Sequence, residues 1–453
     1  MKQDTAAKTM ITTAVVFMGF ALTFGLLVAL KYIYPNIGNI EYLSAPRMRM
    51  WHTNSILYGW LLPAQMGILL YVIPRILHTK LFSEILGVIT GLIYFGSIIA
   101  GLIGILLGNV KNIEYGEIGS PYDYLVILSW VLFGVNIVAT IINRKVKYLY
   151  VSVWYALGSV IWTFFVMVTG HIFTQMVSGV NQANLNWFYV HNVVGLIFTP
   201  LGVAGAYYLI PKELNTPIYS HKLSMIGFWV ISFVYVWTGA HHMMAGPSPD
   251  WLETVASVFS FSLLIPVIAV ITNFLGTYAT APKENRFKGP VTKFLMGGTI
   301  YYLLTCIQGP MQAIPALNVI ISKNDWIVGH AHMALLGAFS FFAIAGVYYV
   351  IPKIAGRPLH NSKLADQSFW IMLIASIPFF SSLFISGVIQ GNMWLDPENT
   401  FVQTLMATKK WHVIRALSGA FIIYAYFLFV HIIVMTLIGK GDVNQEITEE
   451  VVS

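Results

Sequence analysis

Charged residues are scarce in this sequence and cysteine is nearly absent. Only 9% of the 453 residues are charged and 57% are hydrophobic, whereas soluble domains carry about 25% charged residues. This composition excludes a soluble domain. The apolar runs are near-continuous, which excludes the alternating pattern of a transmembrane β-barrel. We therefore expect an all-α integral membrane protein that is surrounded by the lipid bilayer.

The single cysteine, Cys306, excludes an intramolecular disulfide and a Cys-x-x-Cys-His site for attaching c-type haem. It also excludes a thiolate-bridged copper pair within this chain. The net charge of +7 does not indicate nucleic-acid binding, because the basic residues lie in short loops, where they orient the chain and meet anionic lipid. No small-residue cleavage site follows residues 1–9, so the first apolar run is predicted to remain as a helix.

Twelve apolar runs are long enough to span a membrane. No stretch has the composition of a separate soluble domain, so residues 1–453 are predicted to form one transmembrane catalytic domain. Its loops are short and end in a proline followed by a basic residue at Pro74-Arg75, Pro211-Lys212, Pro282-Lys283 and Pro352-Lys353. The tail after Gly439 is short and acidic. The predicted spans are 10–35, 49–75, 82–110, 122–143, 149–176, 185–211, 221–243, 251–279, 289–318, 325–351, 365–390 and 409–438.

Lysine and arginine are distributed unequally between the two sides of these spans. With the N-terminus inside, the outer side holds only eight of the 25, and the other 17 face inward. Cytoplasmic loops carry an excess of these residues, so both termini are predicted to be cytoplasmic. The eight outer residues are Lys31, Arg47, Arg49, Lys111, Lys323, Lys409, Lys410 and Arg415.

One stretch, Asp325-Trp-Ile-Val-Gly-His-Ala-His-Met-Ala-Leu335, places His330 and His332 inside hydrocarbon. Polar, metal-competent side chains at membrane depth are costly and usually functional. Residues i and i+2 of a helix lie about 200° apart, so the two rings face opposite ways and can each hold a different cofactor. The alternative is that both rings only hydrogen-bond neighbouring helices.

Six histidines from four predicted spans fall at one level, in the outer third of the bilayer. Neutral imidazole is a preferred ligand for haem iron, copper and non-haem iron, and haem needs one or two axial ligands. Two of the six are placed to clamp one haem, and a third to hold a second haem with an open position. The last three supply a three-nitrogen site opposite that position, where Gly239 lets the helix end loosen. The pair for the first haem is His52 and His332, the ligand for the second haem is His330, and the three-nitrogen site is His191, His241 and His242.

These motifs resemble the catalytic subunit of the haem–copper oxidases, in particular that of the cbb3-type (C-family) cytochrome c oxidases. The twelve-helix count agrees with that fold. The matching stretches are Trp51-His-Thr-Asn54, Tyr189-Val-His-Asn-Val-Val-Gly195, Tyr235-Val-Trp-Thr-Gly-Ala-His-His242 with Pro249-Asp-Trp251, Gly309-Pro-Met311, and Asp325-Trp-Ile-Val-Gly-His-Ala-His332.

The resemblance implies three cofactors and a reaction. The cofactors are a low-spin haem b on His52 and His332, a high-spin haem b3 on His330, and copper (CuB) on His191, His241 and His242. The reaction is the reduction of O2 to water with electrons from cytochrome c, coupled to proton uptake and translocation. Its location would be the cytoplasmic (inner) membrane of a bacterium.

Nitric oxide reductases are the alternative, because they share this fold and the six histidines but carry non-haem iron instead of copper. They commonly place a glutamate one turn after the helix-six histidine, where this chain has Gly195. C-family oxidases carry a tyrosine six residues before the His-His pair, where this chain has Tyr235. In that family the tyrosine is covalently joined to the histidine that matches His191 and supplies an electron and a proton for O–O cleavage. Tyr235 and His191 are therefore the implied catalytic residues; otherwise Tyr235 is an interior aromatic hydrogen-bonded to a neighbour.

One position departs from the family, which usually has a glutamate just before Gly-Pro-Met, where this chain has Gln308. Arg49 lies three residues before His52, where the family places an arginine that binds a haem propionate, and Arg415 is a further candidate for such a contact. The alternative for both arginines is a lipid-headgroup contact.

Protons for the implied reaction must cross the membrane interior. Tyr235, Ser232, Ser224 and Tyr207 form a polar series leading inward on the sixth and seventh spans, although ordinary helix–helix hydrogen bonding is the alternative for all but Tyr235. His171 and His412 have no family ligand position. They are predicted to be structural or to lie beside a propionate.

Electrons must come from other subunits, since the chain has no c-haem motif. The resemblance implies membrane-anchored c-type cytochrome subunits at the outer face, with soluble cytochrome c as a candidate donor. A transporter or channel with an intramembrane metal site is a different class of function. Such folds often show internal repeats and midplane sites, but this sequence shows no convincing repeat, and its histidines cluster near the outer face.

Overall fold

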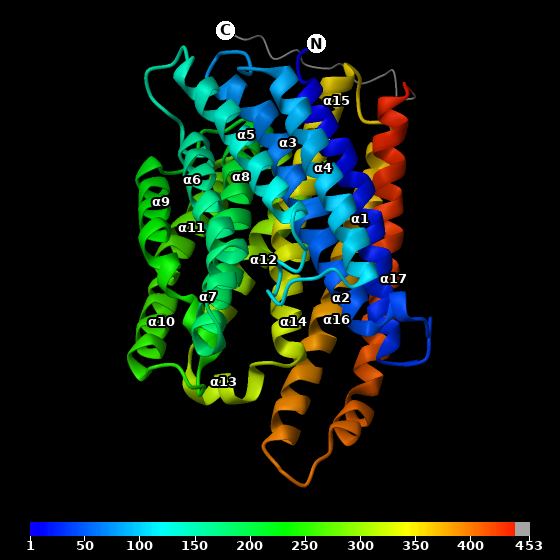
Figure 1. The fold of residues 1–453 in the computed structure, drawn as a ribbon. Helices are drawn as coiled ribbons and strands as arrows, with labels where there is room; N and C mark the ends of the chain where they lie inside the picture. The colour runs from blue at the N-terminus through cyan, green and yellow to red at the C-terminus, as the bar shows by residue number, and fades with distance from the viewer. Residues whose placement is uncertain (440–453) are drawn as a thin grey trace.

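The protein is all-α, as its composition predicts. In a computed structural model, residues 1–439 are described, so the acidic tail after Gly439, with Lys440, lies outside the described residues. Helices and turns account for the described part of the chain, where the only strand-like pairing is an isolated bridge between Val110 and Ile118. The helices stand side by side in one bundle (Figure 1).

Eleven helices of the described chain are long and apolar enough to cross a membrane, and a bent pair makes up to twelve. The spans are α1 (Thr5–Lys31), α2 to α3 (Ala45–Asn54, Leu62–Ile76), α4 (Glu84–Leu107), α5 (Tyr122–Ile142), α6 (Val151–His171) with the short turn up to Met176, α7 to α8 (Gly179–Asn192, Thr199–Leu214), α9 (His221–Val234) with the turns up to Met243, α10 to α11 (Asp250–Ser262, Leu264–Thr280), α12 with α13 (Pro290–Gln312, Pro315–Ile321), α14 to α15 (Asp325–His332, Phe341–Ala355), α16 (Ser362–Trp394) and α17 (Phe401–Leu437).

Most predicted spans agree with these helices to within a few residues, and three differ in an informative way. The ninth is bent by 108° between α12 and α13, where Pro315 starts a new helix because its ring removes a backbone donor. The sixth starts at Gly179 rather than 185, and the last starts at Phe401 rather than 409. In both of these the polar outer turn of the helix extends beyond the apolar run that predicted it.

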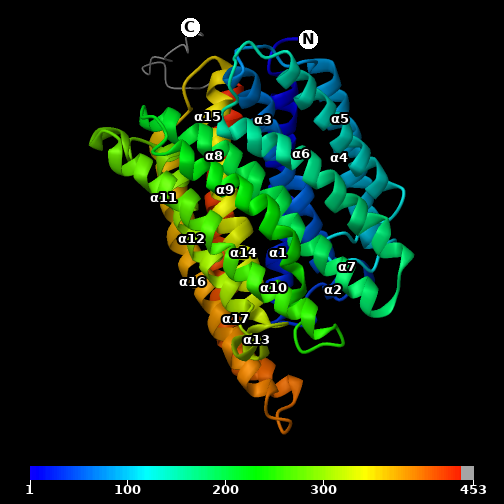
Figure 2. The ribbon, with the colours of Figure 1, turned by 90° about the vertical axis from the view of Figure 1, so that its left-hand side faces the viewer.

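The first turn of α1 and the last turn of α17 lie at the same end of the bundle (Figure 1), which we call the inner end after the lysine and arginine distribution. At the outer end, α16 and α17 run together past the other helices in two views (Figures 1 and 2). They contain 33 and 37 residues, or about 50 and 55 Å at 1.5 Å per residue, which exceeds the ~30 Å of bilayer hydrocarbon.

An internal repeat exists, contrary to the expectation from the sequence. Three spans each contain a π-helical stretch after their histidines: η2 (Ser55–Leu61), η4 (Val193–Phe198) and η8 (Met333–Ser340). Each span then ends in Tyr-x-Ile-Pro followed by a basic residue, at 71–75, 208–212 and 349–353. These three prolines lie inside α3, α8 and α15 rather than in loops as predicted. All three spans run inward, so this is not the inverted repeat of a transporter.

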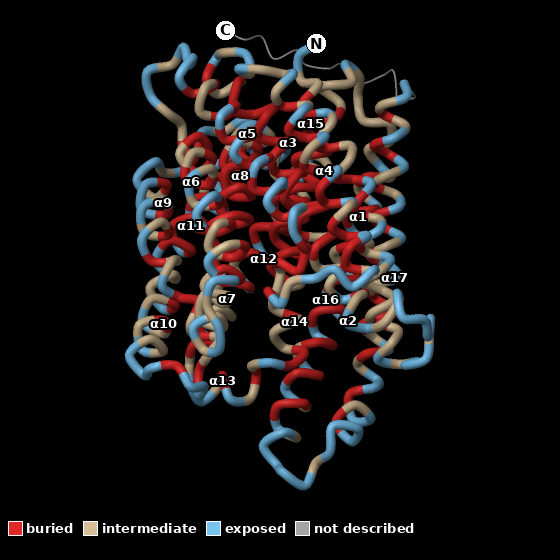
Figure 3. The backbone as a smooth tube through the Cα atoms, in the orientation of Figure 1, coloured by how far each residue is buried: buried red, intermediate tan, exposed pale blue. Residues whose placement is uncertain are grey.

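The three repeated spans form the centre of the bundle. Their most apolar windows are 94%, 89% and 100% buried, against 33–56% for the other single spans. Buried backbone is concentrated around α3, α8 and α15 at the inner end, while the outer half around α7, α10 and α14 is less buried (Figure 3). Because π-bulges distort a helix locally and recur at functional sites, we expect a site in the less buried half next to them.

Candidate metal centre

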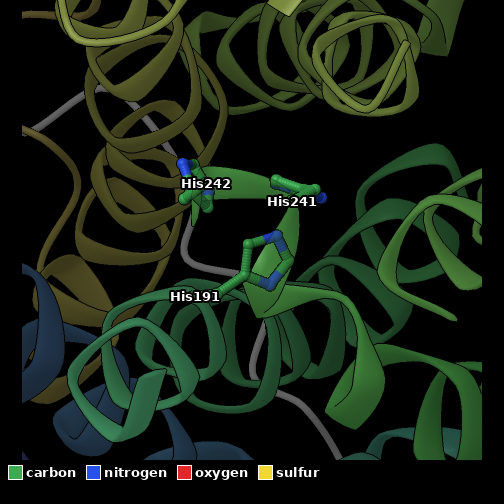
Figure 4. A group of neighbouring side chains, drawn as sticks. All are labelled: His191, His241 and His242. Atoms are coloured by element: carbon green, nitrogen blue, oxygen red, sulfur yellow. The ribbon is translucent and has the colours of Figure 1, made fainter. Parts of the chain in front are cut away.

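Three histidines from two segments form a cluster in the outer half. His191 comes from α7, and His241 and His242 come from the short turn η6 (Gly239–Met243). Nitrogen atoms of the three rings lie within 4.8 Å of one another, and Figure 4 shows the three side chains next to each other. Gly239 permits this approach, since a Cβ there would lie 2.7 Å from the Trp187 carbonyl oxygen of α7.

Hydrogen bonds fix which ring nitrogen carries the proton in two of the three histidines. Thr238 Oγ1 donates its only proton to the Tyr235 carbonyl (2.7 Å), so it accepts from His191 Nδ1 at 2.9 Å. Ser260 Oγ donates to the Ala256 carbonyl (2.6 Å), so it accepts from His241 Nδ1 at 2.7 Å. His191 and His241 therefore carry their protons on Nδ1 and leave Nε2 bare, as a metal ligand requires. The third ring, His242, stacks on Trp187 with 4.1 Å between ring centres.

A second pair, His52 of α2 and His332 of α14, lies on the other side of α14. The ring centres are 6.0 Å apart and the rings are inclined by 16°. Two imidazoles bound to opposite sides of one ion would have their ring centres about 6 Å apart, because each metal–nitrogen bond is roughly 2 Å long and each ring centre lies beyond its nitrogen. Each Nδ1 donates to a backbone carbonyl at 2.7 Å, from His52 to Ala21 and from His332 to Val328. Both Nε2 lone pairs are thus available, and the pair fits an axial clamp on a flat cofactor.

His330 faces away from that pair and lines a partly enclosed cavity with the three clustered histidines and Tyr235. It is close enough to act electrostatically on all three clustered rings. Its Nδ1 lies 3.2 Å from Gln308 Oε1, so the partner of this ring is a neutral amide rather than a carboxylate. The structure thus brings all six predicted ligands together in two groups, separated by one helix.

Tyr235 begins the short turn η5 (Tyr235–Trp237) and lies against His191, with 4.8 Å between ring centres. A Cβ added at Gly195 would lie 1.7 Å from Tyr235 Cε1. No side chain at position 195 is compatible with Tyr235 in this place. The two positions that distinguish the alternative functions are therefore coupled by direct contact.

Gly195→Ala is expected to displace the Tyr235 ring. Because misplacing a reacting group by about 1 Å can cost 10²-fold, turnover should fall about 100-fold while haem and metal contents stay unchanged. Purified variant and wild type are compared by metal analysis and by turnover. Gly205→Ala on the same helix is the matched control, since its Cβ would meet only Ile68 at 3.9 Å. Wild-type turnover in Gly195→Ala would contradict the coupling.

The two predicted propionate partners differ in their surroundings. Arg49 is half exposed and pairs with Glu117 at 3.1 Å and with Glu114 at 3.9 Å, both in the outer loop between α4 and α5. Burial raises the pKa of the Glu117 carboxyl, while Arg49 and Asn54 favour its ionised form. Arg415 is buried, and its charge acts on both His52 and His332. Arg415 is therefore near both paired rings, whereas Arg49 is near His52 alone.

The predicted polar series is only partly connected. Asn273, which the sequence reading did not single out, donates to Ser224 Oγ (2.8 Å) and to the Tyr207 hydroxyl (3.4 Å). Ser232 instead donates to the carbonyl of Phe228 in its own helix. The structure thus joins Tyr207 to Ser224 through an amide from α11.

His171 lies apart from the two groups, as part of a buried network. Its Nε2 is 3.1 Å from the Tyr189 hydroxyl, and its Nδ1 is 3.4 Å from Asp123. Tyr189 in turn contacts Tyr58 at 2.5 Å between hydroxyls. This network fastens α6 to α7 and η2, which agrees with a structural role for His171.

Comparisons with known proteins bear on this arrangement. The family described as "Cytochrome C and Quinol oxidase polypeptide I" matches residues 5–421. The cbb3-type cytochrome c oxidase subunit CcoN1 of Stutzerimonas stutzeri is 30% identical over 413 residues, which cover 87% of each chain. A cytochrome c oxidase subunit 1 homolog of Agrobacterium tumefaciens (strain T37) is 29% identical over 94% of this chain and 82% of the relative. A cryo-EM structure of a heme-copper terminal oxidase dimer superposes with a TM-score of 0.78 at 15% identity, covering 99% of this chain and 86% of the other.

Proposed function

Because the chain belongs to the cytochrome c and quinol oxidase polypeptide I family, the subunit I proteins of haem–copper oxidases, we propose that it is the catalytic subunit of a cbb3-type terminal oxidase that reduces O2 to water. One observation carries the proposal. Helix α14 presents His332 to His52 on one side and His330 to the cavity of the three clustered histidines on the other.

The residues fit the cofactors of this family. His52 and His332 would hold a low-spin haem b, His330 a high-spin haem b3, and His191 with His241 and His242 a copper ion. When bound, haem iron and copper supply the redox chemistry, because they carry single electrons and leave a position for O2. The protein holds the rings in the tautomer that ligands require and excludes bulk water from the cavity with apolar walls.

Oxygen is favoured over nitric oxide as the substrate by the contact between Gly195 and Tyr235. A glutamate at 195, as in the reductases, has no space beside the Tyr235 ring. The tyrosine hydroxyl would hold a proton at the cavity wall, next to His191, where the reaction consumes protons.

Metal analysis of the purified complex tests this proposal. An oxidase of this kind contains two b-type haems and one copper in this chain. After the iron of any c-type haem is subtracted, three irons and no copper for this chain would contradict the proposal and support a nitric oxide reductase with non-haem iron.

Protons would be supplied from the inner end by the Tyr207, Ser224 and Asn273 series. Tyr207→Phe keeps the ring and removes the hydroxyl, so turnover at saturating donor should fall at least about 10-fold if proton delivery passes through it. Tyr278→Phe, which removes another buried hydroxyl of this region, is the matched control. Unchanged turnover in Tyr207→Phe would remove this residue from the proton path.

The proposed function also implies a membrane location and partner subunits. The chain is a multi-pass membrane protein, and we place it in the cytoplasmic membrane of a bacterium with both termini inside, as the lysine and arginine distribution favours. Membrane-anchored c-type cytochrome subunits would dock at the outer end and deliver electrons, with soluble cytochrome c as their donor.

A further inference from the structure

A group of buried ionisable residues lies at the outer end, and the proposed reaction does not use it. Asp325, the first residue of α14, is 5% exposed, and its Oδ2 accepts from Ser386 Oγ (2.7 Å) and Gln390 Nε2 (2.9 Å) of α16. His412 of α17 is 1% exposed, and its Nε2 lies 3.6 Å from the same oxygen. Three packed helices therefore enclose a carboxylate and an imidazole away from solvent.

Arg415 connects this pair to the proposed haem clamp. It lies one turn beyond His412 on α17 and is 7% exposed. Within residues 1–439 its Nε has no hydrogen-bond partner. Its charge acts on His412 and also on His52 and His332. Arg415 is thus a buried cation near both the haem clamp and the Asp325–His412 pair. Burying this charge costs free energy unless an anion, such as a haem propionate, binds the guanidinium.

The charges around His412 come from few elements. Its ring stacks on Tyr32 of α1 with 4.7 Å between ring centres, and Arg415 lies over the same tyrosine at 5.7 Å. The neighbouring side chains of α16 are neutral. The titratable and charged groups that face His412 are Tyr32 from α1, Asp325 from α14 and Arg415 from α17. Among these three groups, Asp325 is an anion and Arg415 is a cation.

We propose that His412 takes up a proton when the haem held by His52 and His332 is reduced, with Asp325 as its counter-ion. The inference rests on the proposed function, because it requires that haem. The haem that His52 and His332 would hold would take up one electron from the cytochrome donor, which would add one negative charge. One proton from the outer aqueous phase binds the unprotonated nitrogen of His412 and restores the charge, and no other bond forms or breaks. Oxidation reverses both steps.

The physical reason is charge compensation at short range. In a buried site the effective dielectric constant is far below that of water, so a charge change on one group alters the protonation of its neighbour strongly. Asp325 and Arg415 act on the ring in opposite directions. An added electron on the adjacent haem therefore tips His412 toward its protonated form, and by reciprocity the proton raises the haem's reduction potential.

The test is a spectroelectrochemical titration of the low-spin haem in the purified complex between pH 6 and 9. The wild-type potential should fall with rising pH over part of this range, by up to about 59 mV per pH unit for one proton per electron. His412→Asn should retain the haem spectrum and lose this slope. Asp325→Asn should also lose it, because the ring then lacks its counter-ion. A pH-indicator dye should report proton uptake on reduction in wild type and less in both variants.

His171→Asn is the matched control, since it removes another buried histidine paired with an aspartate and should keep the wild-type slope. A pH-independent wild-type potential, or an unchanged slope in His412→Asn, would overturn the inference while leaving the oxidase proposal standing. Absence of a bis-histidine haem spectrum in wild type would overturn both.

Discussion

We expect His332→Ala to lose the absorption bands of the low-spin haem and nearly all turnover. The loss of one ring would leave the proposed haem with only His52 to hold it, so the low-spin haem b bands should disappear while copper and the other haem remain. Electrons then have no route to the cavity, and turnover should fall at least about 100-fold, the upper range for losing even an outer-sphere partner of a metal site. Absorption spectra and haem-to-protein ratios of purified complexes measure both effects.

The matched control for this substitution is His431→Ala. His431 is a histidine of α17 whose ring neighbour is His360, with 5.7 Å between ring centres, so it should keep both haems. Retention of both haem signals in His332→Ala would contradict the clamp.

Tyr235→Phe should abolish most oxygen reduction without loss of any metal. The phenyl ring fills the same space against Gly195 and His191, so packing is kept and only the hydroxyl is lost. Removing a group that donates a proton in the reaction typically costs 10²–10⁴-fold, so we expect turnover to fall by at least about 100-fold with haem and copper contents unchanged.

Tyr301→Phe provides a comparison, because Tyr301 is also a buried tyrosine but its hydroxyl contacts Ser376 of α16 instead of the cavity. It should keep wild-type turnover. If Tyr235→Phe also did so, Tyr235 would be an interior aromatic and not a catalytic residue.

The sequence predicted the helices and singled out the six histidines that the fold brings together, because both depend on local signals. Long apolar runs identify spans without knowledge of their neighbours, and histidine in such a run is rare enough to be noticed. The opposite orientations of His330 and His332 follow from helical geometry alone. These features needed no information about which helices pack together.

The supporting residues could not be predicted, because their partners are set by packing between distant segments. Thr238 and Ser260 are ordinary hydroxyl residues in the sequence, and only the folded chain shows them accepting from His191 and His241. Likewise, only the folded chain shows that the Tyr235 ring leaves no space for a side chain at position 195, because the two residues belong to different spans.

The threefold repeat was missed for a different reason. The sequence signal common to all three spans is short, a Tyr-x-Ile-Pro motif at the inner end of each span. Its structural signal, a π-helical stretch in each span, has no distinct composition.

Oxygen and nitric oxide turnover, measured side by side on the same purified complex with a reduced cytochrome c donor, tests the central claim most directly. The account predicts rapid, sustained consumption of O2 and little reduction of nitric oxide. Rapid reduction of nitric oxide with no consumption of O2 would contradict it.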